Sequence, residues 1–444
     1  MRVLNLLFSL FLFISLPASA SLPFTIQRFV TSEGLAVAFV HEGSIPMVVM
    51  NLGFHAGSGY DAGSDGLAQL VAKCLGEATS VQNGNQIAES LDASGAEFSV
   101  QVDPDLSVIT MHSQSDAADL NAAVSALIPV ISDLNISPDA LNRVAERDLQ
   151  ALELSHGQAS SIAEDALMQA LFADTPYGHS VLGTKDSISA INLDQVMQFY
   201  HRYYVDQNGV LILVGDIDFS TARAIANQFS KALPSGQPAP LLVVQPHAPR
   251  QTEINIAYPS KQTTILMGEI TRPKVDPLNL ALETGSTILA GPTMESLLYS
   301  SLRQKGLVYS VNSSLNTMNA SGFLSIMAQT KNESADMVIL EMQEALQGLV
   351  NNGPMQSDLE NARSFLMGSF QLGYASDENV ADLLMGLVAY GYPANYFEKR
   401  AQNILLLSSS DITKAFGAVS QSNNGLWVTV KVGGGEGPSE SSAK

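Results

Sequence analysis

The chain has 444 residues, 46% of them hydrophobic, and it carries 43 acidic against 22 basic side chains. Its net charge of −21 repels phosphate backbones and anionic lipid headgroups, so we expect no nucleic-acid partner. The single cysteine, Cys74, excludes an intrachain disulfide, and stability must therefore come from buried apolar surface. At about 100–200 residues per domain, this length predicts two to four domains.

The N-terminus has the three parts of a secretory signal peptide. Arg2 supplies a positive charge, Val3 to Leu16 form an apolar run, and Ala18-Ser19-Ala20 is a small-residue cleavage site. The apolar run is shorter than the ~20 residues that a membrane span needs, and it ends at Pro17. We therefore predict that residues 1–20 are removed and that the mature chain keeps no membrane anchor.

Short strands and amphipathic helices follow in a mixed order. Runs that predict strands are Leu35–His41, Pro46–Phe54, Phe98–Gln101 and Ser107–His112, and runs that predict helices are Asn85–Ser94, Ala117–Asp133 and Ser160–Phe172. The strands come in hairpin-like groups and the helices in blocks. This grouping predicts an α+β fold.

The second half of the chain repeats patterns of the first. A proline- and glycine-rich stretch at 233–250 predicts a linker between an N-terminal domain, 21–232, and a C-terminal domain, 251–432. The strand pattern at Pro46 recurs at Gln262, and the Asn208-Gly209 turn recurs at Asn424-Gly425, at the same offset along the chain. This shared offset predicts a duplicated domain. The Gly/Ser-rich tail, 433–444, is predicted to be disordered.

Several segments of the first half resemble the zinc-site region of the insulinase/pitrilysin-like peptidases, which are inverted zincins. They are His55–Asp61, Gly66–Thr79, Ile87–Ala96, Thr175–Thr184 and Phe199–Gly215. The resemblance covers nearly the whole mature chain. It implies two homologous α/β-roll domains, each a mainly antiparallel mixed sheet with packed helices, in a clam-shell arrangement.

The zinc motif itself is missing. Active members of this family carry H-x-x-E-H on a helix, where two imidazoles bind zinc and the Glu activates water. The corresponding residues are Gln69, Ala72 and Lys73, and none of the chain's seven histidines has a partner four residues away. The resemblance places the third ligand at Ala151, or at Glu146 or Glu153 if the register shifts. We therefore predict no zinc, no other cofactor and no catalytic residue, with Lys73 pairing with a carboxylate such as Glu153.

The segment from Ser296 to Val311 resembles the part of the family's second domain that contacts substrate through an Arg and a Tyr. The correspondence places these roles on Arg303, a fork of N–H donors, and Tyr309, a single O–H donor. The Arg303-to-Gly306 spacing is one residue shorter than in the family, which would rotate Arg303 on its helix. Taken without the resemblance, the sequence favours Arg303 as a solvated helix residue and Tyr309 as a packed strand residue.

Some bacterial members of the family work as two secreted proteins, one with the zinc motif and one that keeps only the Arg/Tyr pair. The resemblance therefore implies a periplasmic, non-catalytic subunit that closes the chamber of a zinc-bearing homologous partner and binds unfolded peptide. The alternative is a stand-alone peptide-binding or assembly protein without a peptidase partner. An enzyme with a new active site is a third, less favoured interpretation.

Overall fold

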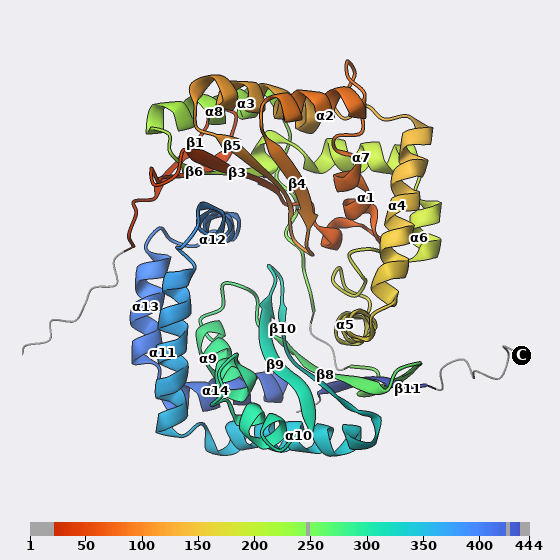
Figure 1. The fold of residues 1–444 in the computed structure, drawn as a ribbon, viewed down its shortest axis with the longest axis vertical. Coiled ribbons are helices and arrows are strands. Elements are labelled where there is room, and N and C mark those ends of the chain that lie inside the picture. The colour runs from red at the N-terminus through yellow and green to blue at the C-terminus, as the bar shows by residue number, and fades with distance from the viewer. Residues whose placement is uncertain (1–21, 246–248, 423–426, 436–444) are drawn as a thin grey trace, which may run out of the picture.

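The computed structural model describes residues 22–245, 249–422 and 427–435. The predicted signal peptide, the predicted turn at Asn424-Gly425 and most of the predicted tail lie outside these residues. The described chain forms two sheets that face each other, each with its own block of helices, like the two shells of a clam (Figure 1). No helix in the three described ranges is long and apolar enough to cross a bilayer.

Each half has its own sheet, and the two sheets have the same topology. The strands of the first half are β1 (Gln27–Val30), β2 (Ala36–His41), β3 (Met47–Phe54), β4 (Glu97–Val102), β5 (Ser107–Gln114) and β6 (Gly209–Gly215). Those of the second are β7 (Glu253–Tyr258), β8 (Gln262–Thr271), β9 (Val308–Thr317), β10 (Gly322–Lys331) and β11 (Val428–Gly434). The strand orders are β1-β2-β6-β3-β5-β4 and β7-β11-β8-β10-β9, so the second sheet repeats the first without β1. In each, one pair is parallel, β2 with β6 and β7 with β11. The duplication predicted from the sequence is confirmed.

The prediction that one offset along the chain relates both pairs of repeated segments is wrong in detail. Gly215, with φ +143°, lies against the backbone of Met47 and Val48, and Gly433, with φ +153°, lies against Gln262 and Thr263 in the same way. Gln262 is therefore the counterpart of Met47 rather than of Pro46, and the two glycines are farther apart along the chain than the two strands that they contact. Because Gly433 and Gly434 pair with β7, the predicted disorder from residue 433 is also wrong at its start.

Helices surround the two sheets. The helices of the first half are α1 (Leu67–Cys74), α2 (Gly84–Ala93), α3 (Ala117–Ser132), α4 (Pro138–His156), α5 (Ala159–Phe172), α6 (Lys185–Ala190), α7 (Leu193–Tyr203) and α8 (Phe219–Ala232), with short turns η1 (Ser58–Tyr60) and η2 (Asp206–Asn208). Those of the second are α9 (Asn279–Ala290), α10 (Ala335–Asn352), α11 (Gln356–Leu372), α12 (Asp377–Ala389), α13 (Tyr396–Leu406) and α14 (Ser409–Ser422), with η3 (Tyr299–Arg303) and η4 (Asn332–Ser334). The first-half strands and helices predicted from periodicity end within two residues of these bounds.

Side chains alternate between the two faces of each sheet, and apolar side chains are buried on both faces. In β3, Met50 and Leu52 point into the core formed with the helices of their own half, whereas Val49 points to the opposite face, toward the other half. In β8, Met267 and Leu266 divide in the same way. The inner face of each sheet therefore needs a cover that its own helices do not supply.

The two halves supply that cover by exchanging one helix each. The α12 helix of the second half packs on β3 and β6 of the first, and α5 of the first half packs on β8 and β11 of the second (Figure 1). The linker joins both cores as well, because Leu242 packs against the apolar clusters on either side. The halves therefore share two mixed hydrophobic cores.

A glycine marks the point where each exchanged helix touches the sheet. A Cβ on Gly53 of β3 would lie 2.6 Å from the sulfur of Met385 in α12, and a Cβ on Gly268 of β8 would lie 2.6 Å from Cδ2 of Leu167 in α5. With Gln262 as the counterpart of Met47, Gly268 occupies in β8 the position that Gly53 occupies in β3. Glycine at these positions lets a helix from the other half approach the sheet closely.

Replacing Gly268 with valine is expected to destabilise the protein by about 1–3 kcal/mol, because the new side chain overlaps Leu167. The free energy of unfolding from denaturant titration measures the effect. Gly348→Ala is the control, because that glycine lies in α10 with nothing within 4 Å of an added Cβ, and it should be neutral or stabilising. Adding Leu167→Ala should make the double variant less destabilised than the sum of the single changes. Strictly additive costs would contradict the proposed contact.

Candidate functional site

The helix that would carry the zinc motif is α1, and its start is held by a buried carboxylate. Asp61 accepts hydrogen bonds from the backbone N–H groups of Gly66, at 2.8 Å, and Ala68, at 2.7 Å. Gly66 has φ +91°, a conformation that glycine adopts at little cost. The His55–Asp61 and Gly66 segments recognised in the sequence therefore position α1, whatever α1 carries.

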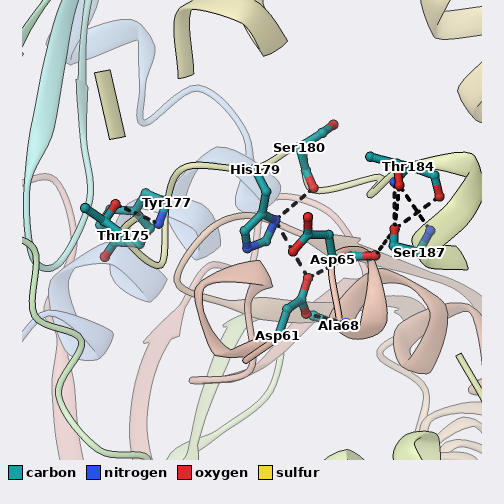
Figure 2. A network of polar contacts seen from close by, with 10 residues as sticks. Asp61, Asp65, Ala68, Thr175, Tyr177, His179, Ser180, Thr184 and Ser187 are labelled. Atoms are coloured by element: carbon teal, nitrogen blue, oxygen red, sulfur yellow. Dashed lines mark hydrogen bonds and ion pairs between the residues drawn. The ribbon is translucent and has the colours of Figure 1, made fainter. Parts of the chain in front are cut away.

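The segment Thr175–Thr184 also holds the start of α1, because its His179 lies beside Asp61 (Figure 2). Nδ1 of His179 lies 3.9 Å from Asp61, and Ser187, just beyond the segment, donates to the carbonyl of Asp65 at 2.7 Å. Burial raises the pKa of Asp61, against the lowering effect of its two backbone donors and of His179. These contacts give His179 a structural role at the start of α1.

The motif positions on α1 contain no zinc-binding group. Gln69 is half-buried, Ala72 is only 1% exposed within the core, and Lys73 projects to the surface. Cys74 is fully buried, and burial raises the pKa of its thiol to about 12, so it is a packing residue. In the described part of the chain, no three His, Cys, Asp or Glu side chains lie close enough together to hold a metal ion. These residues do not fit zinc.

The acid of α4 that interacts electrostatically with Lys73 is Asp148. Both Ala151 and Glu153 are exposed, whereas Asp148 is 5% exposed. Burial raises the pKa of Asp148 to about 6, and the positive charge of Lys73 acts in the opposite direction. Lys73 therefore has a nearby carboxylate in Asp148, whereas the third-ligand position at Ala151 stays a prediction.

The burial of Asp148 follows from the periodicity of α4. The buried residues of this helix are Ala140, Leu141, Val144, Asp148 and Leu152, and from Leu141 onward they are spaced three or four residues apart. Ala151 and Glu153 lie outside that stripe. The same spacing is present in the sequence, and it was the signal that could have identified Asp148 as the inward-facing acid.

Arg303 is the last residue of η3, and Tyr309 is the second residue of β9. Ser310 pairs with Gln329 and Val308 with Thr330, so Tyr309 is the extra residue of a β-bulge. Nη1 of Arg303 donates to the carbonyl of Val308 at 3.2 Å. The preceding turn, η3, is a π-helix that ends at Arg303, at the point where the sequence showed an unusual spacing. Tyr309 remains 46% exposed.

Two cavities lie away from this pair. One, of about 610 Å³, is formed between the halves and is lined by Asp105, Glu164, His179, Lys274, Met318 and Tyr390. Another, of about 740 Å³, lies in the second half, where Arg400 binds both carboxylate oxygens of Glu283 at 2.6 and 2.7 Å. Neither lining includes Arg303 or Tyr309. Sequence reasoning missed Asp105 and Lys274, because no local motif marks residues that meet only when two domains pack.

Comparison with known proteins agrees with this geometry. Residues 36–185 match the family model described as "Insulinase (Peptidase family M16)", and residues 190–366 match "Peptidase M16 inactive domain". The chain belongs to the M16 peptidase family. A crystal structure described as an M16 inactive domain from Pseudomonas fluorescens is 29% identical, with a TM-score of 0.87 over 93% of this chain and 99% of that one.

Relatives within M16 carry different descriptions. A protein of Helicobacter pylori named "Non-peptidase homolog YmxG" is 24% identical over 93% of this chain and 94% of its own length. A protein of Bacillus subtilis named "Uncharacterized zinc protease YmxG" is 22% identical over 79% of this chain and 85% of its own. This chain is an inactive M16 homologue by its residues, because the M16 zinc positions contain Gln69, Ala72 and Lys73.

The mature chain is expected to bind no zinc, whereas Gln69→His, Ala72→Glu and Lys73→His together should introduce one zinc per chain. Asp148 would then be the carboxylate within reach of α1. Metal analysis after dialysis tests both statements. Adding Asp148→Ala should reduce the occupancy strongly, and adding Glu153→Ala should not. The opposite result would favour Glu153, the alternative that a shifted register gives, as the third ligand.

Asp148→Asn should stabilise the protein at pH 8 and have little effect at pH 4. The folded pKa of Asp148 lies above its unfolded value, so the stability linked to its proton is fully present below about pH 4 and is lost as pH rises through about 6. The expected gain at pH 8 is on the order of 1–2 kcal/mol. Melting temperatures across this range measure it, with the exposed Asp139→Asn as control. A gain of equal size at both pH values would exclude titration of Asp148 as its cause.

Proposed function

We propose that this chain is the non-catalytic subunit of a heterodimeric zinc peptidase of the periplasm, and that it binds unfolded peptide beside the zinc of a homologous partner. The observation that carries this proposal is an M16 fold whose motif helix is intact but whose zinc positions are replaced by Gln69, Ala72 and Lys73. The relative named a non-peptidase homologue supports the absence of independent catalysis. The apolar N-terminal run ending in Ala18-Ser19-Ala20 supports secretion.

The Arg303 and Tyr309 pair supports a role toward substrate. A β-bulge interrupts strand pairing and re-aims the side chain at the extra position, and here that side chain is an exposed Tyr. Arg303 lies against the same backbone through Val308 and carries further N–H donors in its guanidinium group. A peptide carbonyl, or the oxyanion that forms on it, is the acceptor that such a pair of donors suits.

Co-expression with a secreted relative that retains the H-x-x-E-H motif tests the proposal. We expect the two proteins to co-elute in size-exclusion chromatography and to cleave an unfolded peptide only together. Separate elution, with full activity of the zinc-bearing protein alone, would reject the heterodimer. Peptide binding by this chain in isolation would then favour the alternative, a stand-alone peptide-binding or assembly protein.

Tyr309→Phe and Arg303→Ala should each reduce peptide cleavage by the assembled pair about 10²–10³-fold, the cost of losing one donor to a transition-state oxygen. Tyr309 is exposed, so its change should alter stability by less than about 0.5 kcal/mol. The measurements are cleavage rate, elution volume and melting temperature.

Lys305→Ala is the matched control for this experiment. Lys305 lies in the same turn, and its ion pair with Glu341, at 3.6 Å, is on the surface. The control variant should retain full cleavage. Full activity in both the Tyr309 and Arg303 variants would leave the pair only a structural role in the bulge.

A further inference from the structure

A buried carboxylate lies where the two halves of the chain meet. Asp105 is 2% exposed and lies in the loop between β4 and β5. The neighbouring Asp103 shapes this loop, because its Oδ1 accepts hydrogen bonds from the backbone N–H groups of Asp105 and Leu106, both at 2.7 Å. The backbone that carries Asp105 is therefore held by contacts within the first half.

The carboxylate of Asp105 accepts three hydrogen bonds, two of which come from the second half. The hydroxyl of Tyr177, from the first half, donates to Oδ1. The backbone N–H of Asn319 donates to Oδ2 at 2.7 Å, and the hydroxyl of Tyr390 donates to the same oxygen at 3.0 Å. The Tyr177 oxygen in turn accepts the backbone N–H of Ala320 at 3.2 Å. The β9–β10 turn is thus fixed to the first half by two consecutive backbone groups.

A lysine of the second half compensates part of the negative charge. Nζ of Lys274 lies 4.4 Å from the centre of the Tyr390 ring and donates to the carbonyl of Thr317 at 3.4 Å. Burial lowers the pKa of Lys274, and the charges of Asp103 and Asp105 oppose that effect. Separating the halves would leave Asp105 without two donors and Lys274 without its two nearby carboxylates. Losing partners of buried charged groups is costly.

The same residues are continuous with the two exchanged helices. Tyr390 directly follows α12, which packs on the sheet of the first half. Asn319 lies in the turn between β9 and β10, the strands at the end of the sheet on which α5 packs. The carboxylate therefore lies between two apolar contacts that both cross from one half to the other.

We propose that Asp105, Tyr177, Asn319 and Tyr390 together form an interdomain latch. This latch holds the two halves as one rigid body around the cavity between them. The latch and the exchanged helices prevent the clam shell of this chain from opening. This inference concerns the chain alone and is independent of a peptidase partner.

Distance measurements between spin labels test the latch on the full mature chain. Asp92→Cys in α2 and Glu344→Cys in α10 place labels on exposed helix positions of the two halves. The native Cys74 is fully buried, and its raised thiol pKa keeps it from competing for the label. We expect one narrow distance distribution in the labelled chain. A broad distribution, or a second longer distance, would overturn the rigid arrangement.

The double variant Tyr177→Phe/Tyr390→Phe removes two of the three donors without removing the rings. It should add a longer-distance population and raise amide hydrogen exchange in 316–321 about 10-fold or more. Tyr204→Phe is the control, because it removes a buried hydrogen bond to Ser107 within the first half only. The control should lose stability without opening. Unchanged distances and exchange in the double variant would overturn the latch, and so would equal opening in the control.

Discussion

The structure depends on two exchanged helices, one from each half, that pack on the sheet of the other half. Each sheet has two apolar faces, and the helices of its own half cover only one. The second face is buried by α12 in one case and α5 in the other. Close approach of a helix to a sheet requires a position without a side chain, which Gly53 and Gly268 provide. Because burial of apolar area is the main source of stability in a chain without disulfides, neither half has a complete set of cores alone.

This arrangement explains how an M16 chain can lose its zinc site and keep its fold. The start of α1 is held by Asp61, Gly66 and the segment around His179, none of which is a motif position. The motif helix contributes Leu70, Val71 and Cys74 to the core, so it continues to pack when its polar positions change. The contacts that preserve the helix and the residues that would perform chemistry are separate sets.

A cation and a buried acid lie close together at the zinc-motif positions of α1. Lys73 lies at the position of the second imidazole, and Asp148, the inward-facing acid of α4, interacts with it electrostatically. A cation near a buried carboxylate reduces the cost of burying that carboxylate, which a zinc ion would otherwise do more strongly. At the interface between the halves, Lys274 has the corresponding effect on Asp103 and Asp105.

The sequence by itself determined the features that follow from local pattern. Alternation and helical spacing predicted the strands and helices of the first half, the repeat predicted two equivalent sheets, and Gln69, Ala72 and Lys73 predicted the loss of zinc. Only the tertiary structure decided which side chains meet across the chain. Asp148 is buried near Lys73 because the buried stripe of α4 sets the rotation of that helix. Gly53 contacts Met385, and Asp105 accepts a hydrogen bond from Tyr390, because α12 packs on the sheet of the first half. Those contacts join residues far apart in the sequence, and local pattern carries no information on how two domains pack.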